Sequence, residues 1–324
     1  MKVVRCTLCA LLAIAALQAA GVASAQQYPA KPIRLIAGYA PGGSTDTIAR
    51  ILAQRLSETI GQPVVVENRV GAAGTIATDM VAKSAPDGYT VLVGDIGGSA
   101  IAPGLYGKLP YDAYKDFEHV TVMVTFPLAV VVPAASRLAG LQQIIDEARA
   151  KPSTLTYGSQ GIGSPAHLFT ELINLMANVK TVHVPYKGGA PAMAALLGQE
   201  IDFAVTAVFT AQSNVTAGKL RVLAVTSATS TPRLPGVPPI SSLLPGFDAI
   251  NFHSLHLPTH TPRTIVDKLQ RETVAALHRP DVTKRLDDLS MDVKATSSEE
   301  CAAFIRSEID KWGKVVKATG ARAD

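Results

Sequence analysis

The stretch PIRLIAGYAPGGSTD (residues 32–46) runs from a short apolar segment into a turn rich in glycine and serine. Beyond the turn, apolar residues recur at the spacing of one helix face, at Ile48, Ile51, Leu52, Leu56 and Ile60. Two more apolar segments, residues 64–67 and 89–94, enclose a second helical pattern at residues 75–84. Short strands that alternate with amphipathic helices predict an α/β fold.

The alternation restarts in the second half of the chain. A long apolar run occupies residues 120–133, and a proline-rich stretch at 231–245 ends the pattern. Between them we predict helices at 141–150, 165–177 and 190–197, and strands at 154–158, 181–185, 201–206 and 221–226. Two helices are predicted to close the chain, the second with an apolar face made of Cys301, Ile305, Ile309, Trp312 and Val316.

The composition fits a two-domain globular protein. The chain has 324 residues, of which 48% are hydrophobic and 17% charged, so it can bury a large core. The formal net charge of +4, from 30 basic and 26 acidic residues, is spread along the sequence. Because a nucleic-acid interface needs clustered Lys and Arg, we expect no nucleic-acid partner.

The first 25 residues have the pattern of a secretory signal peptide. Lys2 and Arg5 precede an apolar run, and the small residues ASA (23–25) form a cleavage box before Gln26. We therefore expect cleavage near Ala25 and export into a bacterial periplasm. Only Cys301 would remain after cleavage, so no intramolecular disulfide is expected.

Glycine is concentrated where predicted strands lead into predicted helices. Four such junctions are GYAPGGSTD (38–46), GDIGGSA (94–100), GSQGIGSPAH (158–167) and PYKGGAPA (185–192). In an open α/β sheet these turns lie beyond the carboxyl ends of the strands, where ligands bind. Glycine allows close approach of the backbone, and each following helix presents unpaired N–H groups. Two pairs of such turns, facing each other across a cleft, are predicted to hold a small anion.

The third junction also contains the spacing G-x-G-x-x-A (161–166), which matches a dinucleotide fingerprint. The next predicted strand ends at residue 185 without the Asp or Glu that would bind a ribose hydroxyl. Ser164 as N-cap and Pro165 in the first turn better suit a helix end that faces a carboxylate. We therefore expect no nucleotide and no other cofactor.

Several single side chains have both a structural and a functional interpretation. Asp46 lies in the first turn of its helix, where it either stabilises the helix end or accepts a hydrogen bond from a ligand. His167 either packs or donates to a ligand. Tyr39 and Tyr186 either pack or close over a ligand, and Lys187 either pairs with an anion or stays solvated.

The sequence offers little support for a metal site. His253, His256 and His260 have a possible ligand spacing, but residues three apart on a strand face opposite sides, so we expect His253 and His256 to diverge. No zinc-protease, P-loop or nucleophile-elbow motif occurs. The pair His167 and Asp46 is the only catalytic arrangement that the residues suggest.

Seven stretches occur in the order and spacing of one known family: YPAKPIRLIAGYAPGGSTDTIAR, VVVENRVGAAG, APDGYTVLVG, YGSQGIGSPAHL, VHVPYKGGAPAMAALLGQEID, AGKLRVLAVTS and KWGKVVKATG. On these stretches the chain, from residue 28 to about residue 320, resembles the periplasmic solute-binding receptors of tripartite tricarboxylate transporters, also called the Bug family. The resemblance covers nearly the whole chain.

The resemblance implies a type II periplasmic-binding-protein fold, in which two α/β lobes are joined by two crossovers around a cleft. The crossovers are expected near residues 125–132 and 244–252. Lobe 1 would then comprise residues 27–125 and 245–324, and lobe 2 residues 126–244.

The resemblance also implies a small carboxylate in the cleft, held by main-chain amides and ordered water. The first turn maps to Tyr39, Pro41, Gly42, Gly43, Ser44 and Asp46. The second and third turns map to Gly97, Ser159, Gly161, Gly163, Ser164 and His167. The fourth turn and the following strand end map to Tyr186, Gly188, Gly189 and Thr206.

Three departures from the family pattern concern the ligand. Thr206 stands where an Asp is frequent, which favours a ligand without an ammonium group. The two glycines of GDIGGSA (94–100) suggest extra room, so an aromatic or longer carboxylate is expected to fit. The stretch NFHSLHLPTHTP (251–262) replaces one that usually contains Trp and changes one cleft wall.

We therefore predict a monomeric, non-enzymatic receptor that captures a mono- or dicarboxylate and presents it to separately encoded membrane permease subunits. Two alternatives stay open. The protein could feed a sensor or chemoreceptor, or it could be an exported enzyme that uses His167 with Asp46.

Overall fold

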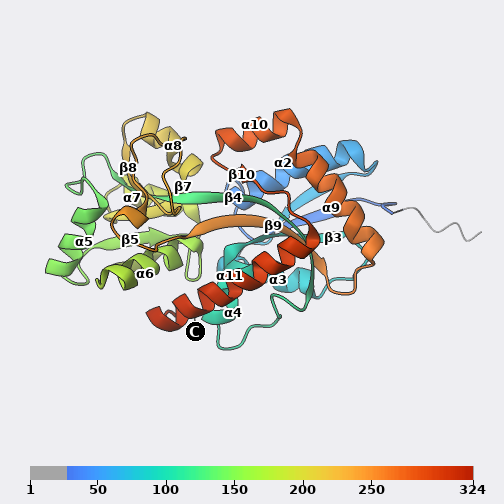
Figure 1. Ribbon diagram of the computed structural model, residues 1–324, viewed down its shortest axis with the longest axis horizontal. Coiled ribbons are helices and arrows are strands. Elements are labelled where there is room, and N and C mark those ends of the chain that lie inside the picture. Colours follow the sequence, from blue (N-terminus) through green and yellow to red (C-terminus); the bar gives the residue numbers. More distant parts are fainter. Residues whose placement is uncertain (1–27, 324) are drawn as a thin grey trace, which may run out of the picture.

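The computed structural model describes residues 28–323, so the predicted signal peptide lies outside the described part. The strands of this part form one continuous mixed sheet of ten strands with the order β2-β1-β3-β9-β4-β7-β5-β6, and β8 and β10 also pair with β4. Helices flank the sheet, and the molecule is elongated with two lobes (Figure 1). Within residues 28–323 no helix combines the length and apolarity needed to span a bilayer.

Lobe 1 begins with the strands and helices that the first apolar segments predict. They are β1 (Ile33–Ala37), α2 (Ser44–Thr59), β2 (Val64–Asn68), α3 (Thr75–Ala82) and β3 (Thr90–Asp95). The three strands are parallel, with β1 in the centre. The predicted stripe on α2 is buried, because Ile48 and Leu56 are completely inaccessible to solvent. This arrangement leaves the turn between β1 and α2 at the carboxyl edge of the sheet.

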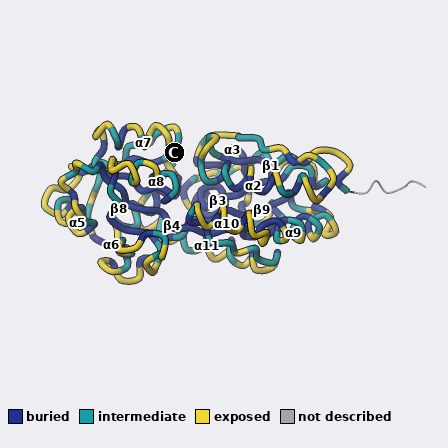
Figure 2. The backbone as a smooth tube through the Cα atoms, turned by 90° about the horizontal axis from the view of Figure 1, so that it is seen from above, coloured by how far each residue is buried: buried dark blue, intermediate teal, exposed yellow. Residues whose placement is uncertain are grey.

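Two long strands connect the lobes. β4 (Phe117–Pro133) pairs antiparallel with β9 (Ile250–Pro258) as far as Pro127, and from Leu128 onward it pairs with strands of lobe 2. The change of partner lies inside the predicted first crossover. The lobe boundaries themselves stay a prediction, which this pairing supports. Figure 2 shows the two lobes as separate bodies with buried strands inside and β4 between them.

Lobe 2 repeats the alternation of strands and helices. Its elements are α5 (Leu141–Ala150), β5 (Thr156–Ser159), α6 (Pro165–Ala177), β6 (Val182–Pro185), α7 (Gly189–Leu197), β7 (Phe203–Ala207), α8 (Val208–Thr216) and β8 (Leu220–Val225). β5 lies parallel to β6 and β7, whereas β8 runs antiparallel to β4. The predicted helices at 141–150 and 165–177 match α5 and α6.

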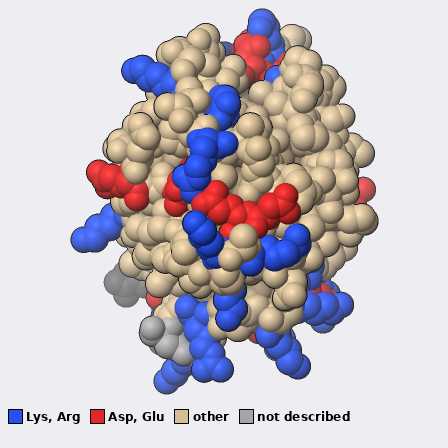
Figure 3. All heavy atoms as spheres, turned by 90° about the vertical axis from the view of Figure 1, so that its left-hand side faces the viewer, with Lys and Arg blue, Asp and Glu red and all other residues tan. Residues whose placement is uncertain are grey.

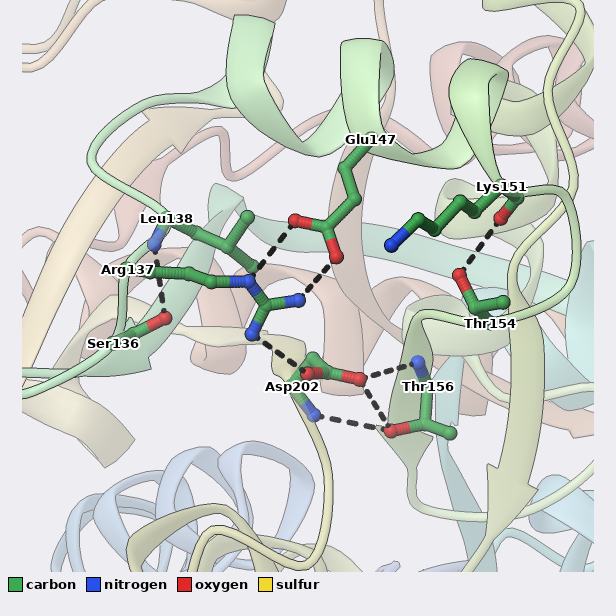
Figure 4. A network of polar contacts seen from close by, with 8 residues as sticks. All are labelled: Ser136, Arg137, Leu138, Glu147, Lys151, Thr154, Thr156 and Asp202. Atoms are coloured by element: carbon green, nitrogen blue, oxygen red, sulfur yellow. Dashed lines mark hydrogen bonds and ion pairs between the residues drawn. The ribbon is translucent and has the colours of Figure 1, made fainter.

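A polar network ties together the edge of lobe 2 where β5 and β7 begin (Figure 4). The Asp202 carboxylate accepts hydrogen bonds from the Thr156 N–H at 2.8 Å and the Thr156 hydroxyl at 2.9 Å. Arg137 forms an ion pair with Glu147 and lies 3.8 Å from Asp202. Basic and acidic side chains are interspersed on the surface at this end of the molecule (Figure 3). The network is at the opposite edge of the sheet from the glycine-rich turns.

The end of the chain returns to lobe 1. It forms α9 (Arg263–Leu277), α10 (Pro280–Asp288), β10 (Asp292–Val293) and α11 (Ser298–Thr319). A capping box starts α11, because the Ser297 side chain accepts from the Glu300 N–H while the Glu300 carboxylate accepts from the Ser297 N–H. The predicted apolar face of this helix is confirmed, since Cys301, Ile305 and Trp312 are completely buried.

Three helices have no predicted range: α4 (Ala102–Leu105), which follows the second glycine-rich turn, α8 and α10. The structure has three closing helices where the sequence pattern predicts two, because the short helix α10 shows only two buried residues, Val282 and Leu286. α8 follows β7 directly, in a segment rich in β-branched residues and without a side chain that caps its first turn. Packing in lobe 2 overrides the weak helix preference of that segment.

Candidate functional site

A cleft of about 520 Å³ lies between the lobes and is lined by both. Half of the predicted site residues line it: Tyr39, Pro41, Gly42, Gly43, Ser44, Gly188, Gly189 and Thr206. The other half lie outside the lining: Asp46, Gly97, Ser159, Gly161, Gly163, Ser164, His167 and Tyr186. The structure thus brings the first and fourth glycine-rich turns to one cavity, and the second and third turns contribute mainly through other residues.

The first turn presents the start of helix α2 to the cleft. Gly43 is the N-cap, with an extended backbone, and no side chain caps the helix. The N–H groups of Ser44 and Thr45 belong to the first helical turn, where no helical carbonyl can accept from them. Both residues line the cleft. Together with the positive end of the helix dipole, they form a place suited to a carboxylate.

Asp46 stabilises this turn through hydrogen bonds and does not line the cleft. Its carboxylate accepts hydrogen bonds from the Gly42 N–H at 3.0 Å, from Arg50 at 2.9 Å and from Asn68 at 3.0 Å. Burial acts to raise the pKa of Asp46, but the hydrogen bonds from Arg50, Gly42 and Asn68 outweigh it and lower the pKa. Asp46 is only 3% exposed and does not reach the lining, which supports the structural interpretation of this residue.

The fourth turn presents the start of α7 from lobe 2. Gly188 has φ of +119°, a conformation that side chains with a Cβ rarely adopt, and a Cβ added there would meet no atom within 4 Å. Lys187 also lines the cleft, and it forms no ion pair among the described residues. Tyr186 lies outside the lining and packs against the apolar core of lobe 2.

The third turn supplies Gln160 and Pro165 to the lining, whereas its predicted residues shape the turn. Ser159 Oγ accepts from the Gly161 N–H at 3.0 Å. Ser164 is the N-cap of α6, as predicted, but its hydroxyl has no hydrogen-bond partner among the described residues.

His167 contributes to lobe 2 by packing. Its Nδ1 accepts from the Gly163 N–H at 3.1 Å, and its ring stacks on His183 with centroids 4.0 Å apart. Burial lowers the pKa of His167 to about 4. Burial, followed by the proximity of His167, lowers the pKa of His183 to about 3. Both rings are therefore neutral at pH 7, and the packed interpretation of His167 is supported.

The second turn contributes the floor of the cleft through Asp95. This residue ends β3 and lies opposite His253 of β9 in the antiparallel register. The Asp95 carboxylate accepts hydrogen bonds from the Gly97 N–H at 3.2 Å and the Gly98 N–H at 3.3 Å. Gly97 therefore does not line the cleft itself but holds a side chain that does. Burial raises the pKa of Asp95 to about 6, although the hydrogen bonds act in the opposite direction.

His253 and Asn251 complete the floor from β9. His253 is 1% exposed and packs beside Phe126, with ring centroids 5.2 Å apart. Burial lowers the pKa of His253 to about 3, although the Gly94 carbonyl acts to raise it. His256 faces elsewhere, with its Nδ1 at 3.0 Å from Nδ1 of His119, so the two histidines diverge. Within residues 28–323 no group of three potential ligands could hold a metal ion.

The wall formed by lobe 2 is mainly apolar. It includes Leu128, Pro191, Met193, Ala194 and Leu197. The end of β7 adds Thr206 and Ala207, and the start of α8 adds Thr210. The cleft therefore combines two helix N-termini, a polar floor and an apolar wall, which suits a ligand with a charged head and a hydrocarbon body.

Sequence reasoning missed six polar lining residues: Thr45, Asp95, Gln160, Thr210, Asn251 and His253. Asp95 and Gln160 stand inside two of the glycine-rich junctions, so the strand-end position was a signal that could have found them. His253 was considered only as a metal ligand. Asn251 reaches the cleft through the antiparallel pairing of β9 with β4, which the local pattern does not reveal.

Comparison with known proteins places the chain in a family. A model of the tripartite tricarboxylate transporter family receptor matches residues 48–321. BugT of Bordetella pertussis is 35% identical over 308 residues, which cover 94% of this chain and 94% of that protein. These matches confirm the resemblance seen in the sequence motifs.

Solved structures agree with the fold. The R. palustris protein Rpa4515 with adipate superposes with a TM-score of 0.87 at 33% identity, covering 91% of this chain and 99% of that chain. MatC of Rhodopseudomonas palustris with bound malate has a TM-score of 0.84 at 31% identity, covering 89% and 100%. The predicted two-lobe α/β fold of a periplasmic binding protein is thereby confirmed.

Proposed function

The chain belongs to the family of tripartite tricarboxylate transporter receptors, and from that premise we propose that it captures a small carboxylate in the cleft between its lobes. The family is one of periplasmic solute-binding proteins. Two relatives of known structure hold carboxylates, adipate in one and malate in the other. Adipate and malate are ligands of those two proteins. The ligand of this chain is therefore inferred from the residues that line its own cleft.

One observation carries the proposal: the N-termini of α2 and α7, one from each lobe, both line the same cleft. Each end offers main-chain donors and a positive dipole end, and Lys187 adds a full positive charge next to the second. A carboxylate bound between them would hold the lobes together. Closure by a hinge motion then follows from binding itself.

The cleft favours a ligand with an apolar body. The wall of lobe 2 is made largely of proline, methionine, leucine and alanine side chains, and the volume lies within the usual range for small-molecule sites. A mono- or dicarboxylate with an aliphatic or aromatic body fits this lining.

The proposal is one of binding and release without chemical change. The catalytic pair that the sequence suggested, His167 with Asp46, does not meet in the cleft, since both residues lie outside its lining and belong to different lobes. We propose further that export follows cleavage near Ala25, and that membrane permease subunits encoded separately receive the ligand.

The test is a thermal-shift screen of carboxylic acids, each compared with its primary amide. A ligand that binds only the folded state at about a hundred times its Kd stabilises that state by about 2.7 kcal/mol. We expect acids with an apolar body to raise the melting temperature by several degrees and their amides to leave it unchanged. Equal shifts with acids and amides, or none with any acid, would contradict the proposal.

A further inference from the structure

A buried carboxylate without a cationic partner lies on the cleft floor. Asp95 is 5% exposed, and its hydrogen bonds come from the main-chain N–H groups of Gly97 and Gly98. None of the ion pairs within residues 28–323 includes it. Neutral donors solvate a carboxylate but do not neutralise it, and an unpaired charge that is buried is strongly unfavourable. The floor is therefore electrostatically incomplete without a ligand.

His253 adds an unused acceptor beside Asp95. The two residues are direct partners in the antiparallel pair of β3 and β9, so their side chains leave the same face of the sheet. His253 Nδ1 lies 3.4 Å from the Gly94 carbonyl oxygen, which can only accept, so the neutral ring carries its proton on Nδ1. Nε2 is then an acceptor, and it has no partner among the described residues.

The Tyr39 hydroxyl is a side-chain donor near Asp95, and it can satisfy only part of the hydrogen-bonding capacity of the floor. A Cβ built on Gly97 would lie 2.7 Å from the Tyr39 hydroxyl and 3.2 Å from Asp95 Oδ2, so both oxygens face the same point. The hydroxyl can offer one neutral hydrogen to the carboxylate. It does not supply a positive charge, and it does not reach both acceptors of the floor with a single hydrogen.

The charges of the cleft are arranged as a pair of opposite sign. Of the lining residues, Asp95 from lobe 1 is negative and Lys187 from lobe 2 is positive, and the two form no ion pair with each other. The floor of the cleft thus carries a negative charge, and the N-terminal end of α7 carries a positive charge. A ligand with one charge of each sign at its two ends complements this arrangement, whereas a dicarboxylate places one negative end against Asp95.

We infer that the ligand carries a protonated amine at the end remote from its carboxylate, and that Asp95 and His253 bind this amine. An ammonium group has three hydrogens to donate, so it satisfies both acceptors and compensates the buried charge. The inference rests on the proposed function, because the carboxylate is taken to bind at the N-termini of α2 and α7. It replaces the expectation, drawn from Thr206, that the ligand lacks an ammonium group.

The test compares acids that differ only at the far end. δ-Aminovalerate, δ-hydroxyvalerate, valerate and glutarate are titrated calorimetrically, together with the same four end groups on shorter and longer chains. We expect the amine to bind about tenfold more tightly than the unsubstituted acid, and the dicarboxylate to bind most weakly. Equal affinity for the amine and the unsubstituted acid at every chain length would overturn the inference.

Variants of the floor residues test whether Asp95 and His253 cause the preference for the amine ligand. Asp95→Asn keeps the shape and the acceptor for Gly97, and we expect it to reduce the preference for the amine to about threefold or less. Asp248→Asn, at an exposed carboxyl outside the lining, should leave the preference unchanged. His253→Phe provides a second measurement if Asp95→Asn does not fold. It should lower the affinity for the amine more than the affinity for the unsubstituted acid.

The outcomes separate this inference from the proposed function. If acids bind but Asp95→Asn weakens all of them equally, the amine site is wrong while the receptor function stands. If no acid binds the wild-type protein, both are wrong.

Discussion

Phe169 of α6 and Trp312 of α11 stack face to face, with ring centroids 5.0 Å apart and 9° between the ring planes. The first ring belongs to lobe 2, and the second belongs to the closing helix of lobe 1. Trp312 is completely buried, and its indole N–H donates to Glu308 at 2.9 Å. The lobes are therefore joined by a packed aromatic pair as well as by the two crossover strands.

Removing the indole should weaken this joint. Trp312→Ala deletes a fully buried aromatic side chain, for which the loss of unfolding free energy is about 3–5 kcal/mol. Because the lost contact joins the lobes, we also expect a less cooperative denaturant transition with a lower m-value. Circular dichroism measures both quantities.

Phe304→Ala is the matched control, because Phe304 lies on the same helix but packs on Phe252 inside lobe 1, with ring centroids 5.0 Å apart. It should lower stability and leave the transition cooperative. Identical m-values for Trp312→Ala and Phe304→Ala would show that the stack does not couple the lobes.

Gly43 provides a direct test of the first turn. Its backbone is extended, with φ of −75° and ψ of 172°, so Gly43→Val should fold normally. The added side chain stands at the N-cap where the cleft is lined, and we expect carboxylate binding to fall below detection by calorimetry. Gly140→Val is a close control, because Gly140 is also an extended N-cap, of α5, and a Cβ there meets no atom within 4 Å. Unchanged affinity in Gly43→Val would remove the first turn from the site.

Lys187 is predicted to act as a countercharge from lobe 2. Lys187→Gln should weaken carboxylate binding by about fivefold or less at low salt, and the difference from wild type should shrink as salt rises, because the side chain is exposed. Lys180→Gln, at another exposed lysine of the same lobe, serves as the control. A loss that is independent of salt would point to a structural effect.

Asp46 is predicted to stabilise the turn without touching the ligand. Asp46→Ala removes the hydrogen bonds to Gly42, Arg50 and Asn68, and we expect a loss of about 1–3 kcal/mol in unfolding free energy. Asp267→Ala breaks an exposed pair with Arg263 and should cost about 0.5 kcal/mol. Equal losses of unfolding free energy in the two variants would contradict a stabilising role of Asp46 in the first turn.

The pH dependence of this effect has a definite sign. The pKa of Asp46 is lowered in the folded protein, so its stabilisation is fully present above the unfolded pKa, about 3.9, and is lost as pH falls through the folded value. The stability difference between wild type and Asp46→Ala should therefore be constant at neutral pH and shrink below about pH 4. Urea unfolding across this range measures it.

Local pattern predicted most of the fold, because most helices have clear apolar faces and several strands lead into glycine-rich turns. The stripe of α2 and the bounds of α6 are examples. The exceptions, α4, α8 and α10, are short helices with few buried apolar residues. Their formation depends on tertiary packing, which single-sequence periodicity does not contain.

The cleft was harder to predict than the fold. The glycine-rich turns lie at the edge of the sheet where the cleft is found, and two of them supply main-chain groups to the lining. The side chains of the floor depend on which strands become neighbours. Asp95 and His253 are 158 positions apart in sequence and meet only because β3 pairs with β9.

The chain passes between its halves inside a hydrogen-bonded ribbon, with β4 changing partners after Pro127. Proline has no amide hydrogen, so the ribbon loses one rung at this point, while the residues on either side remain paired. If one lobe rotates against the other, we therefore expect β4 to twist near Pro127, where its pairing partner changes from β9 to β7 and β8.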